Sequence, residues 1–325
     1  MRIRLPTALV CCLLLPFRLN GWGFFAHQRI NRLAVFSLPP EMMAFYKPQL
    51  DFITQHAVDP DKRRYAVAAE GPRHFIDIDH YGPPPFDSLP RGWQAAVDKY
   101  TEDTLQRHGI LPWHIPRMMA RLTEAFMARD AARILKLSAE LGHYIADAHV
   151  PLHASANHNG QLTNQHGIHG LWESRIPELA ADQTFDYLAG HASYIADVQA
   201  FAWEIVLSSA LAADTVLRLE KELSAQFPPA QRYAYEKRNG ILVRNFSKAY
   251  ALAYHRRMGD MVERRMRLSI RATASCWYTA WVNAGQPALT ELSGKHFPAE
   301  DVQQFRQLDQ AWRKGVQAGQ KACGE

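Results

Sequence analysis

Apolar side chains recur at spacings of three and four residues along most of the chain, which is the period of an amphipathic α-helix. The pattern is strongest in the segments 122–148, 199–224 and 245–270. Alternating runs of the kind that predict β-strands do not compete with these segments. The sequence therefore predicts an all-α fold.

The domain organisation follows from the same pattern and from length. No internal repeat, low-complexity tract or linker-like stretch divides residues 22–325. About 300 residues permit one large domain or two small ones. A single helical domain over residues 22–325 is the simpler interpretation.

Residues 1–21 have the features of a secretory signal peptide. Two arginines lie within the first four residues, an uncharged run extends from Leu5 to Phe17, and a short polar stretch ends at Gly21. The run is too short to span a bilayer, which needs about 20 apolar residues. We expect cleavage near Gly21/Trp22 and a protein that is periplasmic or secreted.

Charge and composition narrow the function. The full chain carries a formal net charge of +5, and the three arginines of the signal segment account for part of it, so residues 22–325 carry +2. So mild a charge argues against tight binding of duplex DNA driven by charge alone. Removal of the signal leaves Cys276 and Cys323, and whether they form a disulfide stays open. The 15 histidines matter more, because neutral imidazole is the commonest metal ligand.

The segment LGHYIADAHVPLH carries the strongest chemical signal. His143 and Asp147 are four residues apart near the end of a predicted helix, so both side chains lie on one helical face. His153 follows, and HGIHGLWES then supplies His169 and Glu173 at the same spacing of four. Nitrogen and oxygen ligands in this mixture suit zinc, and three protein ligands per ion leave one position open.

Upstream residues complete a larger candidate set. Asp59 and His74 come from HAVDPDKRR and PRHFIDIDHY, although an aspartate before a proline is also typical of a turn or helix cap. Trp22 and His27 stand directly after the expected cleavage point. A free amino group at Trp22, together with its carbonyl oxygen, would be able to chelate a metal ion.

These motifs, in this order from Trp22 to Glu173, resemble the superfamily that joins bacterial zinc-dependent phospholipase C to the single-strand-specific zinc nucleases of fungi and plants. The resemblance implies a single helical domain with a trinuclear zinc cleft. It assigns His74, His143, Asp147 and Asp59 to one zinc ion, and Trp22, His27 and the bridging Asp147 to a second. The third ion would be bound by His153, His169 and Glu173.

The resemblance also implies a mechanism of phosphodiester hydrolysis. Two bridged zinc ions would activate a water, and the third would neutralise charge on the phosphoryl and leaving oxygens. Asp59 matches the family residue proposed to orient the water. In the nucleases an arginine three positions beyond that aspartate contacts phosphate, and here Lys62 stands at that position, with Arg63 and Arg64 next.

The substrate remains divided between the two branches. Phe75 and Asp77 match the stacking aromatic and the base-reading carboxylate of the nucleases. An equal alternative is that Phe75 packs in the core and that Asp77 is a partner of Arg73 or of a metal-bound histidine. Glu173 and the short gap from His153 to His169 resemble the phospholipases. We expect a nuclease acting on single-stranded nucleic acid and 3′-nucleotides, with phospholipase C acting on phospholipid head groups as the alternative. A zinc-stabilised protein without turnover is a third class, and no stable protein partner is expected.

Overall fold

The computed structural model describes residues 23–238, 241–292 and 297–317. This part of the chain is mostly helical, with a single two-stranded sheet, as the sequence predicts for the fold class. The signal segment, Trp22 and Cys323 lie outside the described residues. The α-helices of the described residues are α1 (Phe24–Ala34), α2 (Pro40–Tyr46), α3 (Leu50–Gln55), α4 (Asp59–Arg63), α5 (Trp93–Tyr100), α6 (Glu102–Arg107), α7 (Leu111–Met127), α8 (Ala131–Ala148), α9 (Ile168–Gly170), α10 (Ile176–Thr184), α11 (Val198–Gln226), α12 (Lys248–Arg257), α13 (Met261–Asn283) and α14 (Ala299–Gln317).

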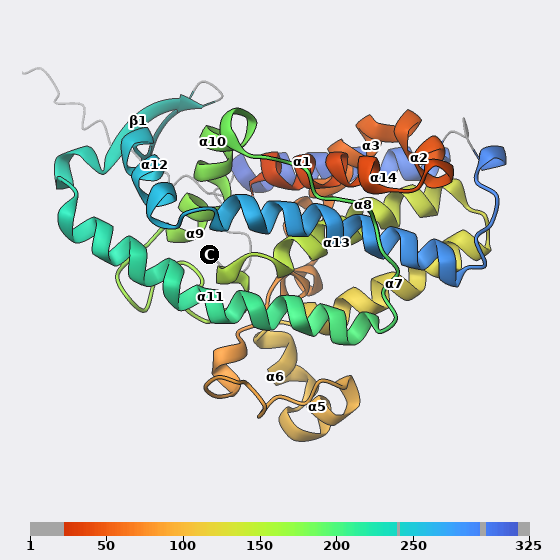
Figure 1. Cartoon of the computed structure of the whole chain (residues 1–325), viewed down its shortest axis with the longest axis horizontal. Coiled ribbons are helices and arrows are strands. Elements are labelled where there is room, and N and C mark those ends of the chain that lie inside the picture. Colours follow the sequence, from red (N-terminus) through yellow and green to blue (C-terminus); the bar gives the residue numbers. More distant parts are fainter. Residues whose placement is uncertain (1–22, 239–240, 293–296, 318–325) are drawn as a thin grey trace, which may run out of the picture.

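Helix α8 is the centre of the molecule. It contacts α1, α7, α11 and α13, and the long helices run roughly along the long axis of the body (Figure 1). Every residue of α8 from Leu137 to Ala148 is buried. The helix therefore carries two functions at once, because its apolar side chains form the core while His143 and Asp147 are held at its buried C-terminal end.

A glycine allows α1 to approach α8 closely. A Cβ atom at Gly142 would lie 2.0 Å from Oδ1 of Asn31 on α1, which no real packing permits. The Asn31 amide instead donates a hydrogen bond of 2.9 Å to the carbonyl oxygen of Ala139. His27 lies one turn before Asn31, so the same close approach brings the ring of His27 onto that of His143, with 3.8 Å between centroids.

The predicted helix 122–148 is two helices. Between α7 and α8, Arg129 adopts a left-handed φ of 53°, and the side chain of Asp130 caps α8 by accepting a hydrogen bond of 3.1 Å from the backbone N–H of Arg133. The apolar period continues across the break because both helices pack into the same core. Periodicity alone therefore missed a boundary that the capping aspartate marks.

The other two predicted helices differ in outcome. The prediction for 199–224 is confirmed as α11. The segment 245–270 is helical only in part, because it begins in a strand and the chain turns between α12 and α13, where Gly259 has a φ of 62°.

A β-hairpin lies at one end of the molecule. Strands β1 (Tyr233–Arg238) and β2 (Ile241–Phe246) pair antiparallel, with Tyr233 opposite Phe246. These strands were not predicted from the sequence. The ring of Phe246 stacks on Tyr250 of α12 at 5.5 Å, which fixes the base of the hairpin to the helical body.

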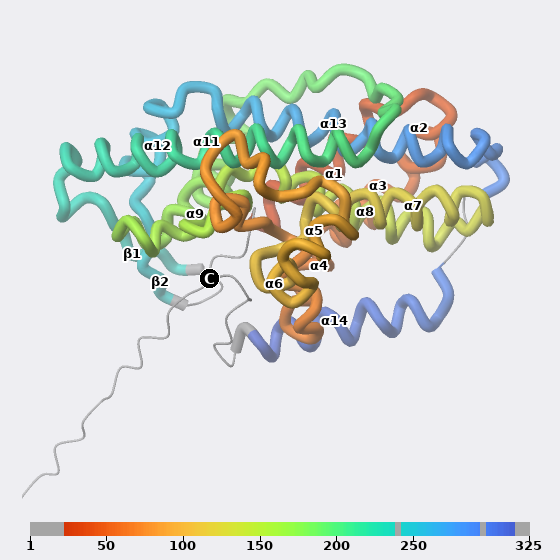
Figure 2. Tube along the Cα trace, turned by 90° about the horizontal axis from the view of Figure 1, so that it is seen from below, coloured from red at the N-terminus to blue at the C-terminus, as the bar shows by residue number. Residues whose placement is uncertain are grey.

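Helix α14 lies along one side of the body beside α4, as the tube in Figure 2 shows from below. Lys62 on α4 is 3.6 Å from Asp309, and the ring of Phe24 lies 5.2 Å from that of Trp312. The C-terminal helix therefore covers the short helix α4, an arrangement that the sequence analysis did not anticipate.

Within the described ranges, α11 is the one helix long and apolar enough to cross a membrane by length and composition. In the structure it packs against α7 and α8 and buries Trp203, Val206 and Val216. Core packing accounts for its apolar character.

Candidate metal centre

Three histidines from separate parts of the chain meet around the carboxylate of Asp147. His27 comes from α1, His74 ends the 3₁₀ helix Ala68–His74, and His143 and Asp147 share a face of α8. Oδ2 of Asp147 lies 2.9 Å from Nδ1 of His74 and 3.2 Å from Nε2 of His143. Oδ1 of the same carboxylate lies 3.3 Å from Nε2 of His27. The two oxygens of Asp147 thus face different histidines, which is the arrangement that a bridging carboxylate requires.

Backbone contacts fix the orientation of His143. Its Nδ1–H donates to the carbonyl oxygen of Ala57 at 2.9 Å, so Nε2 carries the lone pair that faces the cluster. Nε2 of His143 and Nδ1 of His74 are 3.1 Å apart. Two imidazole nitrogens that both present lone pairs repel each other unless a cation or proton lies between them.

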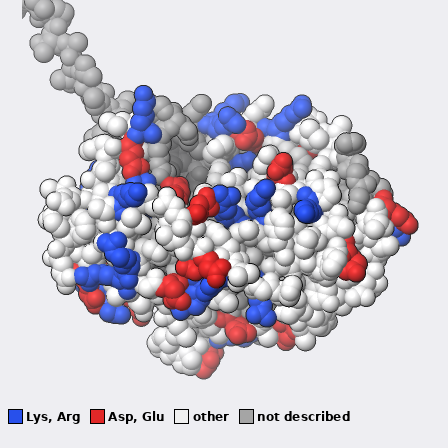
Figure 3. All heavy atoms as spheres, turned by 45° about the horizontal axis from the view of Figure 1, so that its top comes forward, with Lys and Arg blue, Asp and Glu red and all other residues white. Residues whose placement is uncertain are grey.

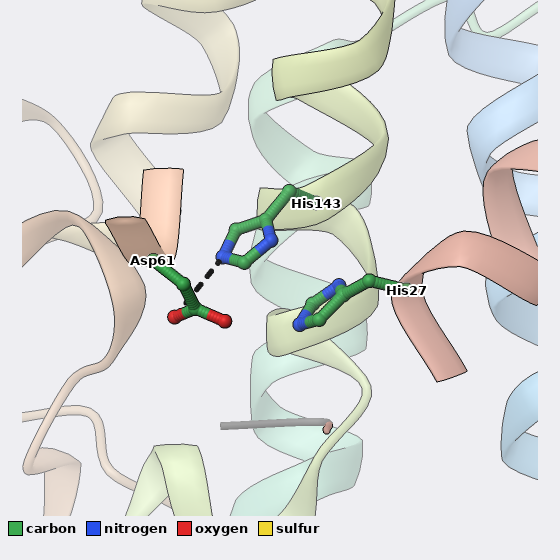
Figure 4. A group of neighbouring side chains, drawn as sticks. All are labelled: His27, Asp61 and His143. Atoms are coloured by element: carbon green, nitrogen blue, oxygen red, sulfur yellow. Dashed lines mark ion pairs between the residues drawn. The ribbon is translucent and has the colours of Figure 1, made fainter. Parts of the chain in front are cut away.

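The carboxylate that faces this group is Asp61, whereas the sequence predicts Asp59. Oδ1 of Asp61 is 3.8 Å from both His74 and His143. Figure 4 shows Asp61, His27 and His143 turned towards a common space, and their ligand atoms lie within 4.8 Å of one another. Asp59 instead contacts His56 at 2.6 Å and Lys62 at 3.5 Å. We call His27, Asp61, His74, His143 and Asp147 the buried cluster.

Helical geometry explains why only one of the two aspartates faces the histidines. Positions two apart in a helical turn point to opposite sides, whereas positions three apart share a side. Lys62 therefore shares a side with Asp59, and Arg64 shares a side with Asp61. Nη1 of Arg64 is 3.5 Å from Oδ1 of Asp61. The predicted catalytic Lys62 faces Asp309 on α14, and Arg64 is the basic residue beside Asp61.

A second group consists of His153, His169 and Glu173, which we call the outer cluster. Nε2 of His153 lies 3.4 Å from Oε2 of Glu173, and Nε2 of His169 lies 3.0 Å from Oε1. The Nδ1 atoms of the two rings contact backbone carbonyl oxygens of His74 and His158. Each histidine therefore directs Nε2 at one oxygen of the same carboxylate.

Irregular backbone positions the outer cluster. Gly167 adopts a φ of 88° immediately before α9, a conformation that disfavours side chains with a Cβ atom. The chain then forms a π-helical turn from Leu171 to Arg175, which carries Glu173. Such turns interrupt a regular helix and are frequent at functional sites. The spacing of four between His169 and Glu173 still brings the two side chains together across α9 and this turn.

The two clusters are adjacent. The backbone N–H of Ile76 donates to the carbonyl oxygen of His153 at 2.8 Å, and His153 Nδ1 contacts the carbonyl oxygen of His74 at 2.5 Å. His153 Nδ1 also lies 4.0 Å from Oδ1 of Asp147. The structure thus brings together His27, His74, His143, Asp147, His153, His169 and Glu173, while Trp22 lies outside the described residues.

The donor atoms fit metal ions. Several ligand atoms are buried and have no hydrogen-bond partner among the described residues; they include both nitrogens of His27, Oδ2 of Asp61, Oδ1 of Asp147, Nε2 of His153 and both oxygens of Glu173. A buried carboxylate oxygen without a partner is costly, and a bound cation removes that cost. These buried histidine and carboxylate clusters are therefore capable of holding metal ions.

Electrostatics favours charged carboxylates here. Burial, the largest single effect, raises the pKa of Asp147, but His143 and His153 together bring that pKa well below its usual range. Burial lowers the pKa of His153, yet Asp147 and Glu173 outweigh it and raise the value to about 9. The carboxylates thus favour protons on His153 and also raise the pKa of His143, and a metal ion would take the place of protons on those two rings.

Glu70 supports His74 from behind. Oε1 of Glu70 is 3.6 Å from Nε2 of His74, and Oε2 accepts hydrogen bonds from Arg63 at 2.9 Å and Arg73 at 2.8 Å. The hydroxyl of Tyr144 also donates to Glu70. This fully buried carboxylate was not predicted from the sequence. The signal that would have indicated it is the spacing of four residues from Glu70 to His74.

The predicted substrate residues follow His74 directly. Phe75 is half-buried and does not belong to the hydrophobic core cluster. Oδ2 of Asp77 lies 3.1 Å from Nδ1 of His108, whose ring stacks on His80 with 3.5 Å between centroids. Burial raises the pKa of Asp77, and His108 opposes that effect. The partner of Asp77 is thus His108 rather than Arg73 or a metal-binding histidine.

Charge is dispersed over the face of the molecule in Figure 3. Lysine and arginine alternate there with aspartate and glutamate rather than gathering in a field of one sign. This face offers single charged contacts and not a broad electrostatic track.

Comparisons with known proteins leave the assignment to the geometry. A search of protein families finds none that matches the chain, and a search of curated proteins finds no match either.

Proposed function

We propose that the chain is a zinc-dependent phosphodiester hydrolase that acts on single-stranded nucleic acid and 3′-nucleotides. The observation that carries the proposal is the convergence of buried, unpartnered ligand atoms in two adjacent clusters. A structural zinc site would use up its coordination positions on protein side chains, whereas the outer cluster offers three ligands. We therefore infer turnover rather than a purely structural role.

The ligand assignment follows the clusters, with Asp61 in place of Asp59. His74, His143, Asp147 and Asp61 would hold one ion. His27 and the other oxygen of Asp147 would hold a second, with the amino and carbonyl groups of Trp22 if export and cleavage leave Trp22 as the first residue. The third ion would be held by the outer cluster. Mixed imidazole and carboxylate ligands at this count suit zinc.

Zinc in these positions would supply hydroxide from bound water near neutral pH and neutralise charge on phosphate oxygens. The protein's own residues would position the reactants. Asp61 would accept a hydrogen bond from the attacking water, because Oδ2 has no hydrogen-bond partner within the described part of the chain. Arg64 would pair with a phosphate oxygen through its planar guanidinium. Asp61 and Arg64 are three residues apart, which is the spacing in the nucleases that the sequence resembles.

Phe75 and Asp77 support a nucleic-acid substrate. Phe75 extends the segment that carries His74, and packing in the core does not account for its ring. Stacking of a base on such a ring contributes about 1 to 3 kcal/mol. Asp77 would read the edge of the stacked base, and its contact with His108 fixes the orientation of the carboxylate.

One observation favours phospholipase C as the alternative. Glu173 occupies a position where the nucleases carry aspartate, and its longer side chain lets each oxygen face a different histidine. That geometry binds an ion equally well in either branch. The substrate therefore has to be decided by assay.

The test uses zinc-loaded protein beginning at Trp22 and four substrates in parallel, namely single-stranded DNA, RNA, a 3′-nucleotide and phosphatidylcholine. We expect turnover of the first three. Phe75→Ala should slow them by the equivalent of about 1 to 3 kcal/mol while sparing an artificial phosphodiester without a base. Hydrolysis of phosphatidylcholine alone would reject the nuclease, and no turnover of any substrate would reject the hydrolase.

A further inference from the structure

A pocket of about 310 Å³ is lined by residues of the 3₁₀ helix Ala68–His74, of α6 and of α7, and no residue of the buried or outer cluster lines it. Its lining includes Arg73, Gln106, His114, Arg117 and Arg121. We call this site the arginine pocket. Positions 114, 117 and 121 fall on one face of α7, because they are three and four residues apart.

The pocket is separate from the metal clusters. Nδ1 of His74 faces Asp147, whereas Nε2 of the same ring faces Glu70. Arg73 contacts Glu70 at 2.8 Å and lines the pocket. Glu70 therefore contacts both a residue of the pocket and a residue of the buried cluster, while no cluster residue lines the pocket.

The pocket carries more positive charge than its surroundings neutralise. Among the described residues, Arg117 and Arg121 have no carboxylate within ion-pair distance. Arg117 lies over the ring of Trp93 at 4.5 Å, and Nη1 of Arg121 is 3.6 Å from the sulfur of Met118. Two like charges one turn apart on a helix repel each other. Arg73 has Glu70, but Glu70 is shared with Arg63.

His114 provides a second, independent observation. It is only 7% exposed, and its Nε2 is buried without a hydrogen-bond partner among the described residues. Burial and, next, the charge of Arg73 lower the pKa of His114 to about 3. His114 lines the pocket, so a neutral imidazole that donates through Nε2 would complement the arginines around an oxyanion. Unlike the exposed arginines, this buried nitrogen does not find a partner in water.

We propose that the arginine pocket binds the phosphoryl group of a phosphomonoester. Guanidinium groups pair bidentately with phosphate oxygens. Three arginines around one cavity match a dianion with three free oxygens better than a carboxylate with two. The volume exceeds what a phosphoryl group alone needs, so the pocket has room for the attached group. This site lies beyond the proposed catalytic function and does not depend on it.

The test measures binding without turnover. Zinc-loaded protein is titrated by calorimetry with inorganic phosphate and, separately, with adenosine 5′-monophosphate. Arg121→Ala and Arg117→Ala should each weaken one binding event by about tenfold, which is the loss of one charge-assisted hydrogen bond. Tighter binding of the nucleotide than of phosphate would identify a phosphomonoester as the ligand. Equal affinity for the two probes would show that the pocket binds free phosphate, and it would overturn the proposal of a phosphomonoester.

Arg133→Ala is the matched control, since Arg133 is an exposed helical arginine on α8 and its removal changes the net charge equally. We expect the control to bind both probes like the wild type. Melting temperatures verify folding of each variant. Equal affinity in the wild type, both pocket variants and the control would overturn the proposal, as would equal weakening in the control.

Discussion

The buried cluster and the outer cluster use similar ligands on different kinds of backbone. In the buried cluster, His27, His143 and Asp147 come from regular helices that also form the core, and their side chains are at most 1% exposed. In the outer cluster, His169 follows a left-handed glycine and its side chain is 18% exposed. The first cluster is therefore built into the packed helical core, whereas the second depends on local turns.

The largest expected effect distinguishes a carboxylate proposed to bind two metal ions, Asp147, from one proposed to bind a single ion, Glu173. Asp147→Asn should lower activity by about a thousandfold or more and deplete two zinc ions together, because the two oxygens of Asp147 face different histidines. Glu173→Gln should deplete chiefly one. Metal content per protein, measured by mass spectrometry, checks both variants. Loss of the same single ion in each would contradict a bridging role for Asp147.

The helical pairs of ligands were accessible from the sequence. His143 with Asp147, and His169 with Glu173, show the spacing that places two side chains on one face, and the structure brings each pair together. This inference succeeds because it depends only on local geometry. It held even across the π-helical turn, which the sequence did not predict.

The choice between Asp59 and Asp61 was not accessible in the same way. Both flank Pro60, and spacing to His74 does not distinguish them. Their directions depend on where the turn of α4 begins relative to the core, which is a tertiary property. The spacing of three from Asp61 to Arg64 was the one sequence signal in favour of Asp61.

The fold shows the same division between local and tertiary information. The length of α11 followed from periodicity, whereas the break before α8 required recognition of Asp130 as a cap. The hairpin had a signal in the dipeptide Asn239-Gly240, which is typical of two-residue turns. The position of α14 over α4 rests on contacts between distant segments, such as Lys62 with Asp309, and no local pattern predicts it.

The second prediction tests whether Asp61 or Asp59 belongs to the buried cluster. Asp61→Asn should reduce zinc content and lower activity by about a hundredfold, in the range expected for loss of a catalytic polar group. Asp59→Asn removes the same charge two residues away, where the partners are His56 and Lys62, and should retain its zinc. Metal analysis and initial rates on a 3′-nucleotide compare the two variants. Zinc loss in Asp59→Asn with full zinc in Asp61→Asn would restore the original assignment.

The smallest expected effect tests the difference in backbone directly, through one glycine beside each cluster. In Gly142→Ala the new methyl group would lie 2.0 Å from Oδ1 of Asn31, so the buried Asn31 side chain or α1 itself has to shift, and overpacking of this kind costs about 1 to 3 kcal/mol. In Gly167→Ala the backbone has to hold a φ of 88° with a Cβ atom present, at a cost of about 1 to 2 kcal/mol. The first variant should lose stability and also zinc from the buried cluster, since His27 lies one turn from Asn31 on α1 and His143 follows position 142 on α8. The second should lose zinc from the outer cluster with a smaller change in the free energy of unfolding, measured by urea denaturation with zinc analysis on the same samples. If Gly167→Ala depleted the buried cluster as strongly as Gly142→Ala does, the two sites would be one cooperative unit, and the contrast drawn from their backbones would be wrong.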